Sequence, residues 1–429
     1  MVLIWTKDKP VKEELLKSYW LLYFDPNEFN SKQIALNMIK LLMESTLTEA
    51  TSLEELLNFM LDWNNNIDDK EKEKEKKKDL FNISSSVFQA LWDTFLNGMN
   101  GSVSKVETRC ALQLLRICQN KNKDILSLKV DSFYNILSSY SKKNSQNVDW
   151  IIVKEISLII EKMNEKTARS NQIIKLLMFL LITFEGTKDT EYFSAAEQII
   201  NMIFALKKND ADSFSQYLIK KMTGFLFDSK ELENKIDEEL PLSVISNNFE
   251  DSLAQLIFII GHVAIKFLVF LDNHESELKR KKTEAETKYQ ADQKENPNED
   301  LDKIQGGVEA EFGKKIEFLH QISEKHLLQN NLLSLYVPWI QKIARDILEG
   351  RRKGVNEILD RTVLLTLCKF MCVSGEFCRN NLDLLFKLMN SNSDSVIKNN
   401  IIISLGDLMH RYPNIIEPFT NNVYQKYKK

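Results

Sequence analysis

Apolar residues recur at the spacing of an α-helix along almost the whole chain, and no other feature limits the fold as strongly. In segment 33–43 they fall on one helical face: Ile34, Met38, Leu41 and Leu42. The same pattern returns in segments 155–163, 173–184, 195–206 and 332–340. Only 12 glycines and 7 prolines interrupt 429 residues, too few for the many turns of a sheet protein. The sequence therefore predicts an all-α protein with long helices and short connections.

Short polar breaks separate the apolar segments and carry residues that favour the start of a helix. The breaks lie at 187–189, 208–210 and 391–394, and each ends with an aspartate. Such side chains accept hydrogen bonds from the unpaired N–H groups of a first helical turn. Helices of about 12 to 20 residues with such breaks give about 35 to 45 residues per helix pair, the period of HEAT-type repeats. We therefore expect a HEAT-repeat α-solenoid, made of stacked antiparallel helix pairs.

Two charged segments divide the chain into five predicted parts. Segment 68–79 alternates Lys, Glu and Asp without an apolar face, which is typical of a solvated loop. Segment 275–312 is also charged and is broken at Asn296-Pro297 and at Gly306-Gly307, so we expect an insertion that is partly exposed helix and partly disordered. The parts are N-terminal helices at 1–66, a charged loop at 67–80, HEAT-like repeats at 81–274, the insertion at 275–312 and HEAT-like repeats at 313–429.

The longest apolar run, 256–271, contains His262 and Lys266 and is too short and too polar to span a membrane. We therefore predict a fully buried helix there and no contact with a membrane. The opening residues 1–5 lack the basic segment of a secretory signal. The five cysteines are odd in number and lie inside helical patterns, which is typical of a reducing compartment.

No catalytic, cofactor or metal site emerges from the sequence. Segment 306–315 contains glycines and lysines, but their spacing does not fit a phosphate-binding loop. Cys368, Cys372 and Cys378 lack a fourth ligand for zinc and are expected to be core cysteines. His262 and His410 have no evident catalytic partner. We therefore predict a protein that is not an enzyme and needs no cofactor, metal or small-molecule substrate.

The net charge of −4 argues against a protein that is basic throughout, so any contact with DNA needs a local patch. Two basic clusters provide candidates for a contact with DNA or with a partner protein. They consist of Lys279, Arg280, Lys281, Lys282, Arg351, Arg352 and Lys353. A third cluster lies at 426–429, although solubilising charge is the ordinary explanation for each of them.

Segment 393–424 predicts a helix, a corner and the start of another helix. Ser393 or Asp394 can begin the first helix, whose apolar stripe is Ile397, Ile401, Leu405 and Leu408. We expect a neighbouring helix to cross closely at Gly406, and Asp407 to bond to a facing helix. Pro413 ends this helix. The next helix begins with Ile415, Ile416, Phe419 and Val423, and its apolar stripe of Ile415, Phe419 and Val423 is expected to lack a cover within the chain.

The same segment resembles the condensin complex subunit 1 family, the HEAT-repeat non-SMC subunits of condensin I. The matching residues are Asn400, Gly406, Asp407, Leu408, Arg411, Pro413, Asn414, Glu417, Pro418 and Thr420. Lys398 stands where the family usually has arginine, and Phe419 where it usually has tryptophan. Segments 258–282 and 365–378 also resemble that family. Its members are longer at the C-terminus, so the resemblance implies a partial array.

The resemblance implies a scaffold subunit for mitotic chromosome condensation. Such a subunit binds the kleisin subunit, works with the SMC ATPases and helps the complex to engage DNA or chromatin. The expected location is the nucleus and chromosomes, with the cytoplasm in part of the cell cycle. Other readings of the same helix pairs stay open: the condensin II subunit, a nuclear transport adaptor or a phosphatase scaffold.

Overall fold

The computed structural model describes thirteen stretches of the chain and residue 27 between the first two. They are residues 9–25, 29–62, 85–119, 126–142, 148–163, 169–183, 190–208, 210–227, 247–295, 301–329, 331–352, 356–391 and 394–419. All regular structure in these stretches is helical, and no strand occurs in them. The predicted all-α fold is therefore confirmed. The charged loop at 67–80, Lys353 and the basic segment 426–429 lie outside the described residues.

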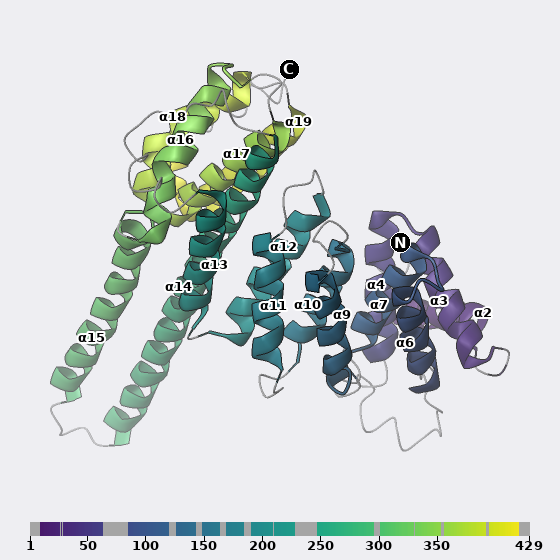
Figure 1. Cartoon of the computed structure of the whole chain (residues 1–429). Coiled ribbons are helices and arrows are strands. Elements are labelled where there is room, and N and C mark those ends of the chain that lie inside the picture. Colours follow the sequence, from purple (N-terminus) through teal and green to yellow (C-terminus); the bar gives the residue numbers. More distant parts are fainter. Residues whose placement is uncertain are drawn as a thin grey trace. The chain divides into compact units, whose positions relative to one another are not determined.

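The chain forms two compact units (Figure 1). Unit 1 comprises Met1–Thr183 with Ser194–Leu206. Its helices are α2 (Lys9–Tyr23), α3 (Ser31–Glu44), α4 (Leu47–Asp62), α6 (Ser85–Met99), α7 (Lys105–Cys118), α9 (Val130–Lys142), α10 (Trp150–Glu161), α11 (Ser170–Thr183) and most of α12 (Thr190–Leu206). Consecutive helices pack together, as α6 does with α7, and α7 also packs against α10.

Unit 2 comprises Phe184–Phe193 with Lys207–Lys429. Its longer helices are α13 (Ala211–Leu226), α14 (Asn247–Glu295), α15 (Leu301–Gln321), α16 (Val337–Leu348), α17 (Glu357–Val373), α18 (Gly375–Ser391) and α19 (Ser395–Arg411). Shorter elements are the π-helix η3 (Ile322–His326), the 3₁₀ helices η4 (Leu332–Tyr336) and η5 (Glu417–Phe419), and α20 (Pro413–Ile416). The helix α17 packs against α14 on one side and against α19 on the other. This stacking matches the predicted HEAT-repeat solenoid.

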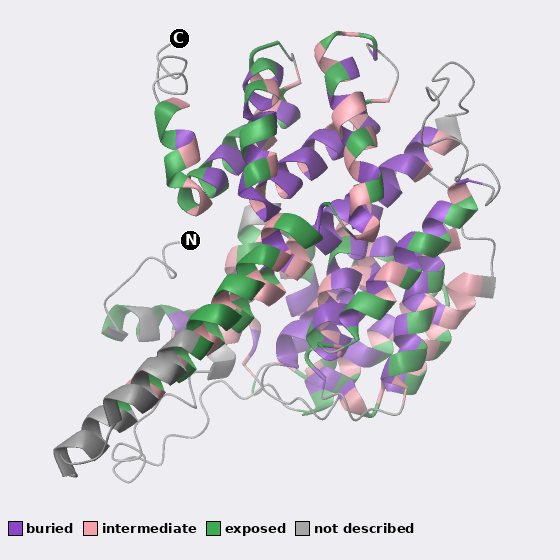
Figure 2. Ribbon diagram, turned by 90° about the vertical axis from the view of Figure 1, so that its left-hand side faces the viewer, coloured by how far each residue is buried: buried purple, intermediate pink, exposed green. Residues whose placement is uncertain are grey.

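The predicted apolar stripes face the helical core. On α3, Ile34, Met38 and Leu42 are buried, and on α19 the whole stripe from Ile397 to Leu408 is buried. Figure 2 shows buried residues concentrated along the stacked helices of each unit. Burial of such stripes removes apolar surface from water and is the main favourable term in folding. The helical period of the apolar residues therefore predicts which face of each helix packs against its neighbours.

Polar contacts between stacked helices recur at a sequence separation close to 40 residues. In unit 1, Arg109 binds Asp149 at a separation of 40, and Gln119 donates to the carbonyl of Ile159 at the same separation. In unit 2, Gln341 donates to Asn381, and this pair is again 40 residues apart. Two of these contacts join the region of α7 to that of α10, and the third joins α16 to α18. The expected repeat length of 35 to 45 residues is thus found in the structure.

A largely buried ion-pair cluster surrounds Arg116 of α7. Its guanidinium donates to Glu155 of α10 at 2.6 Å and to both carboxylate oxygens of Glu54 of α4 at 2.7 and 2.8 Å. Burial opposes the charge, but bonds and charges from Glu54 and Glu155 raise the pKa of Arg116 above its ordinary value. The pKa of Glu54 is lowered because it accepts hydrogen bonds from Arg116. One arginine therefore holds three helices of unit 1 in register.

The apolar run 256–271 forms part of α14, which continues as a single helix far beyond it. Residues up to Ala264 are buried as predicted, whereas Val269 is 41% exposed because the helix leaves the core there. By length and composition the apolar part of α14 passes as a membrane span, but 72% of that window is buried inside the protein. A helix in the core of a protein can be long and apolar enough to pass as a span and still be largely buried.

Beyond Leu271, α14 and α15 run side by side as two long helices (Figure 1). We call residues 272–295 of α14, together with α15, the arm. The residues 275–295 and 301–312 of the predicted insertion are helical, and residues 296–300 lie outside the described stretches. Figure 2 shows the arm as mainly exposed where its side chains are described, in contrast to the stacked helices.

The helix caps and the last stripe test two expectations drawn from the sequence. Asp394 begins α19 by accepting from the N–H of Val396 at 2.8 Å, as predicted, whereas Asp210 makes no such side-chain bond to α13.

The terminal stripe is better covered than expected. Ile416 is fully buried, and the ring of Phe419 stacks on Phe386 of α18 at 5.5 Å. The expectation of an uncovered stripe was therefore wrong for Phe419, whose ring meets α18, and Val423 lies outside the described residues.

Replacing Arg116 by methionine should strongly destabilise unit 1, because Glu155 is then a buried carboxylate without its cation. We expect a loss of about 3 to 5 kcal/mol in the free energy of unfolding, measured by urea denaturation. The double variant Arg116→Met with Glu155→Met should recover most of that loss, since it leaves no buried charge at this position. A double variant as unstable as the single one would contradict the assignment.

Candidate interaction site at the root of the arm

The family-like segment of α19 ends in an ion pair that ties it to the arm. Arg411, the last residue of α19, donates from its two terminal nitrogens to the carboxylate oxygens of Asp272 at 2.8 and 3.2 Å. Burial opposes the charge, but hydrogen bonds from Arg411 to Asp272 and Tyr412 raise the pKa of Arg411 above its ordinary value. We call this two-point ion pair the latch. It joins residues that are 139 positions apart in the sequence.

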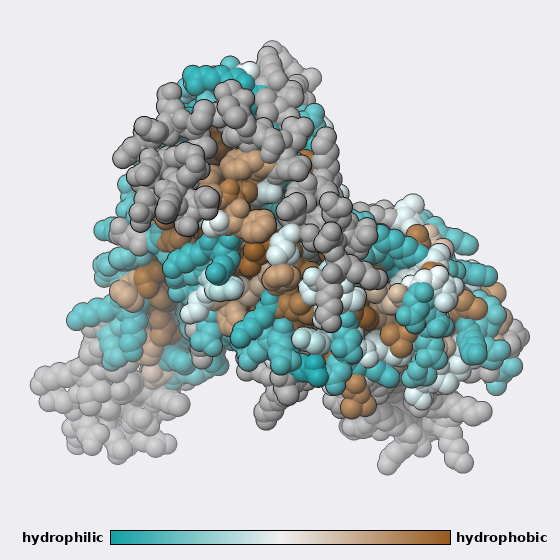
Figure 3. Space-filling view, in the orientation of Figure 1, coloured by the Kyte–Doolittle hydropathy of each residue, from teal (hydrophilic) through white to brown (hydrophobic). Residues whose placement is uncertain are grey.

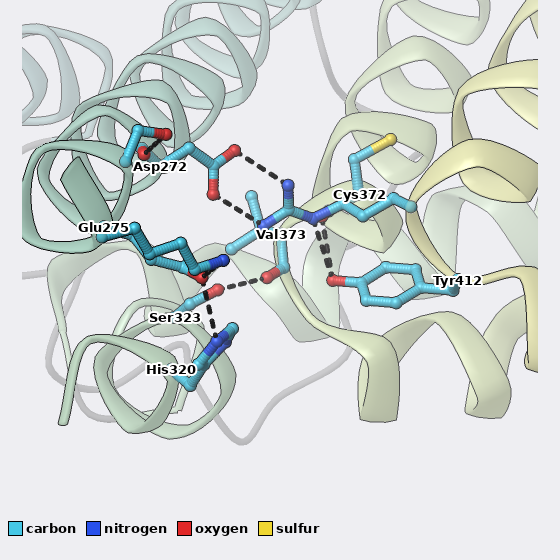
Figure 4. A network of polar contacts seen from close by, with 10 residues as sticks. Asp272, Glu275, His320, Ser323, Cys372, Val373 and Tyr412 are labelled. Carbon is cyan, nitrogen blue, oxygen red and sulfur yellow. Dashed lines mark hydrogen bonds and ion pairs between the residues drawn. The ribbon is translucent and has the colours of Figure 1, made fainter. Parts of the chain in front are cut away.

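Tyr412 extends the latch to the corner between α17 and α18 (Figure 4). Its hydroxyl donates to the carbonyl of Cys372 at 3.0 Å and accepts from Nε of Arg411 at 3.4 Å. Burial raises the pKa of Tyr412 to about 12, so the hydroxyl keeps the proton that it donates. The guanidinium also lies 5.7 Å from the centre of the tyrosine ring. Arg411 and Tyr412 therefore act together on two elements.

The second helix of the arm is anchored to the same corner through η3. The hydroxyl of Ser323 donates to the carbonyl of Val373 at 2.8 Å. The carboxylate of Glu324 accepts from the hydroxyl of Ser374 at 2.9 Å and from the N–H of Gly375 at 2.9 Å. These groups belong to the first turn of α18, where unpaired N–H groups favour a negative charge. Glu324 is thus a cap supplied from another helix.

The structure leaves two of the predicted motif residues, Gly406 and Asp407, exposed on α19. Gly406 has no atom within 4 Å of the position that a Cβ would take, and Asp407 is exposed. Asn400 is half-buried. The expected close crossing at Gly406 and the expected buried bond of Asp407 were therefore wrong. A helix period places these two residues opposite the buried stripe, and only the direction of packing shows that this side is open.

Close helix crossings occur at two other glycines. A Cβ at Gly261 of α14 would lie 2.6 Å from Oγ1 of Thr366 on α17, and that hydroxyl donates to the carbonyl of Ile257 at 3.1 Å. In unit 1, a Cβ at Gly98 of α6 would overlap Thr108 of α7. In both units a threonine fills the space that the absent side chain leaves.

The remaining motif residues shape the corner after α19. Pro413 occupies the first turn of α20, where its missing N–H has no cost, and it is exposed. Glu417 and Pro418 begin η5, and both are exposed. Of the motif, Arg411 alone links α19 to the arm in the described residues.

The four basic residues 279–282 of the arm are each engaged in an ion pair one helical turn away. Lys279 pairs with Glu275, Arg280 with Glu284, Lys281 with Glu277 and Lys282 with Glu286. The four side chains are 37 to 67% exposed, so each pair contributes only about 0.3–0.5 kcal/mol to the helix and can exchange for another anion. The cluster is a neutralised surface rather than a free basic patch.

The second predicted cluster separates into two different environments. Arg351 is exposed and pairs with Asp346 and Glu349. Arg352 is buried, and it donates to Asp360 at 2.7 Å and to Glu250 of α14 at 3.3 Å. Arg352 therefore stabilises the packing of unit 2 and does not face a partner. The spacing of charges along the sequence could not distinguish the two.

The described residues include no group of three or more His, Cys, Asp or Glu that could hold a metal ion. Cys368 and Cys378 are buried, and burial raises the pKa of Cys368 to about 11 and that of Cys378 to about 12. Burial also lowers the pKa of His262 to about 3, which leaves a neutral imidazole packed parallel to Phe258. These groups suit a core and not a reactive centre.

Sequence reasoning missed Asp272, Glu324 and Tyr412. Asp272 follows the apolar run directly, and Glu324 is an ordinary charge in a polar stretch. Their partners lie 139 and 51 residues away, and no local pattern records such distances. The motif drew attention to Arg411, but it gave no sign that the partner is in the arm.

Comparison with known proteins gives a consistent set of relatives. The chain is 24% identical to "Condensin-1 complex subunit CAP-D2" of Arabidopsis thaliana, an alignment that covers 99% of this chain and 29% of that protein. It is 27% identical to "Condensin complex subunit 1" of Schizosaccharomyces pombe and of Saccharomyces cerevisiae, and both alignments cover 99% of this chain and 37% of those proteins. This chain is a relative of condensin complex subunit 1.

The condensin relatives are much longer than this chain, which spans about 29 to 37% of their length. A scan against protein-family models gives no match. A solved chain from a study of Kap95p binding to RanGDP covers 99% of this chain and 61% of its own length at 11% identity, with a TM-score of 0.29. That score is too low to compare the two arrangements.

Gly261 and Gly406, both in unit 2, are expected to respond in opposite ways to replacement by alanine. Gly261→Ala should destabilise the protein by about 1–3 kcal/mol, because the new Cβ meets Thr366. Gly406→Ala should stabilise it by about 0.5–1 kcal/mol, because its site is open and glycine costs helix stability. Urea denaturation of the two variants measures both. Destabilisation by Gly406→Ala would mean that α19 is covered in solution.

Proposed function

We propose that this chain is a non-catalytic HEAT-repeat subunit of the condensin complex that binds the kleisin subunit and assists SMC and DNA engagement in mitotic chromosome condensation. The observation that carries the proposal is the similarity to condensin complex subunit 1 across 99% of the chain. The expected place of work is the nucleus and the chromosomes. The relatives extend well beyond this segment, so partners of the whole complex are part of the proposal.

The fold supports a binding role rather than a chemical one. Stacked helix pairs contact their neighbours in the array and present long surfaces to extended partners. The ionisable groups whose pKa is strongly shifted are core or ion-pair residues, such as Arg116, Cys368 and Tyr412. In this proposal ATP hydrolysis belongs to the SMC partners.

A pull-down of the endogenous protein, followed by mass spectrometry, tests the condensin assignment. We expect a kleisin subunit and SMC ATPases among the captured proteins. The capture of phosphatase subunits or nuclear transport cargo in their place would favour one of the other helical scaffolds. Recovery of neither a kleisin nor an SMC protein from mitotic cells would count against the proposal.

A contact between the arm and DNA is a separate part of the proposal. Lys279, Arg280 and Lys281 are exposed and Lys282 is half-buried, and ion pairs at such sites are of the weak surface kind that phosphate can replace. In the second cluster Arg351 is exposed, Arg352 is buried and bonds to Glu250 and Asp360, and Lys353 lies outside the described residues. The arm is therefore the stronger candidate of the two.

Replacing the four basic residues 279–282 of the arm by glutamine should weaken DNA binding and flatten its dependence on salt. Each phosphate contact that is lost should reduce the slope of log K against log salt by about 0.9. Fluorescence anisotropy with a labelled duplex at several salt concentrations measures this slope. The matched control is Lys314→Gln with Lys315→Gln on α15 of the same arm. Equal slopes in wild type and the 279–282 variant would remove this cluster from the DNA-binding surface.

A further inference from the structure

The arm is built to stay straight without support from the core. Ion pairs one turn apart follow each other along α14, and Lys315 pairs with Glu311 on α15 in the same way. The two helices contact each other, and apolar side chains along the arm and at its root are half-buried: Leu271, Leu278, Phe312, Ile316 and Leu319. Figure 3 shows apolar surface between α14 and α15 near the root. Pairs of this spacing favour the helical state of exposed segments.

Both helices of the arm are fixed at the root to one short corner of the stack. On α14, Asp272 binds Arg411, whose neighbour Tyr412 bonds to Cys372. On the α15 side, Ser323 and Glu324 bond to the next residues of the corner, from Val373 to Gly375. Glu275 links the two helices, because its carboxylate lies 2.6 Å from Lys279 and 3.5 Å from His320. Figure 4 shows the contacts of Asp272, Glu275, Ser323 and Tyr412 together.

The two roots differ in kind. Continuous α-helix passes through Asp272, whereas the other helix changes to a π-helix at η3 before it reaches the corner. A π-helix has wider and less favourable hydrogen bonding, so it bends more easily than an α-helix. The latch is the part of the root that joins the arm to the end of α19, on the side of the stack that carries the family-like motif.

We propose that the arm is a rigid lever whose direction is set by the latch between Asp272 and Arg411, so that the position of the arm and the stacking of α19 on α17 change together. With the latch closed, a load on the arm is transmitted to the last helices of unit 2. With the latch open, the arm bends where α14 leaves the core, η3 keeps its bonds to the corner, and α19 is released from the arm. This inference concerns unit 2 alone and does not depend on the identity of any partner.

The arm's direction can be measured with spin labels introduced through unnatural amino acids, which leaves the native cysteines in place. One pair, at Thr287 on the arm and Lys387 on α18, reports the arm against the stack. A second pair, at Thr287 and Glu311, reports the arm's own integrity. All three positions are exposed. Pulsed electron resonance then gives a distance distribution for each pair.

In the wild-type chain we expect a single narrow distribution for both pairs. Asp272→Asn should widen the arm-to-stack distribution to about twice its width, because a freed element samples several positions. Arg411→Lys, which keeps the charge but loses the two-point geometry, should give an intermediate width. The exchange Asp272→Arg with Arg411→Asp should restore the narrow distribution. The matched control Glu277→Gln, which breaks an ion pair within α14 of the arm, should leave it narrow.

Four outcomes would contradict the proposal that the latch sets the direction of the arm. The first is an arm-to-stack distribution that is already broad in the wild type. The second is one that stays narrow in Asp272→Asn. The third is a broadening of the Thr287–Glu311 pair in the same variant, because the ion pair would then hold the arm together rather than aim it. A failure of the folded exchange variant to restore the narrow distribution would likewise remove the latch from this role.

Discussion

Each helix of this chain can bury its apolar stripe only against a neighbouring helix, and everything else in the fold depends on keeping that stacking in register. Apolar contact is not directional, so it does not by itself fix how far one helix slides along another. The polar contacts between helices fix this position. Arg109 with Asp149, Gln119 with the carbonyl of Ile159 and Gln341 with Asn381 all join positions 40 residues apart. They set one repeat on the next, and the cluster around Arg116 adds a third helix to the same register.

The same constraint explains where the chain departs from a plain array. Gly261 lets α14 and α17 approach closely enough for Thr366 to bond to the carbonyl of Ile257. Beyond this crossing α14 leaves the core and carries its own stabilising ion pairs, so the helix survives without neighbours on most sides. The arm is thus an extension of a core helix, and its direction is inherited from the packing at the crossing and from the contacts at its root.

This arrangement gives the C-terminal end of the family-like segment a structural role. Arg411 and Tyr412 end α19 and bind two different elements, Asp272 of the arm and the carbonyl of Cys372 at the next corner. Gly406 and Asp407 of the same segment face outward, and no packing within the described residues requires them. One helix therefore serves the internal structure with its C-terminal end and offers a surface with its outer side.

The sequence by itself determined the class of fold, the buried stripes, the cap at Asp394 and the absence of a recognisable catalytic pattern, because these follow from spacing along a single helix. The tertiary structure decided which charges are buried. Arg352 and Arg351 are adjacent in sequence, yet the first is enclosed by carboxylates from α14 and α17 while the second faces solvent. It also decided which glycine marks a close crossing, Gly261 and not Gly406. Both outcomes depend on the partner that each helix face meets, and local sequence patterns do not specify contacts between distant helices.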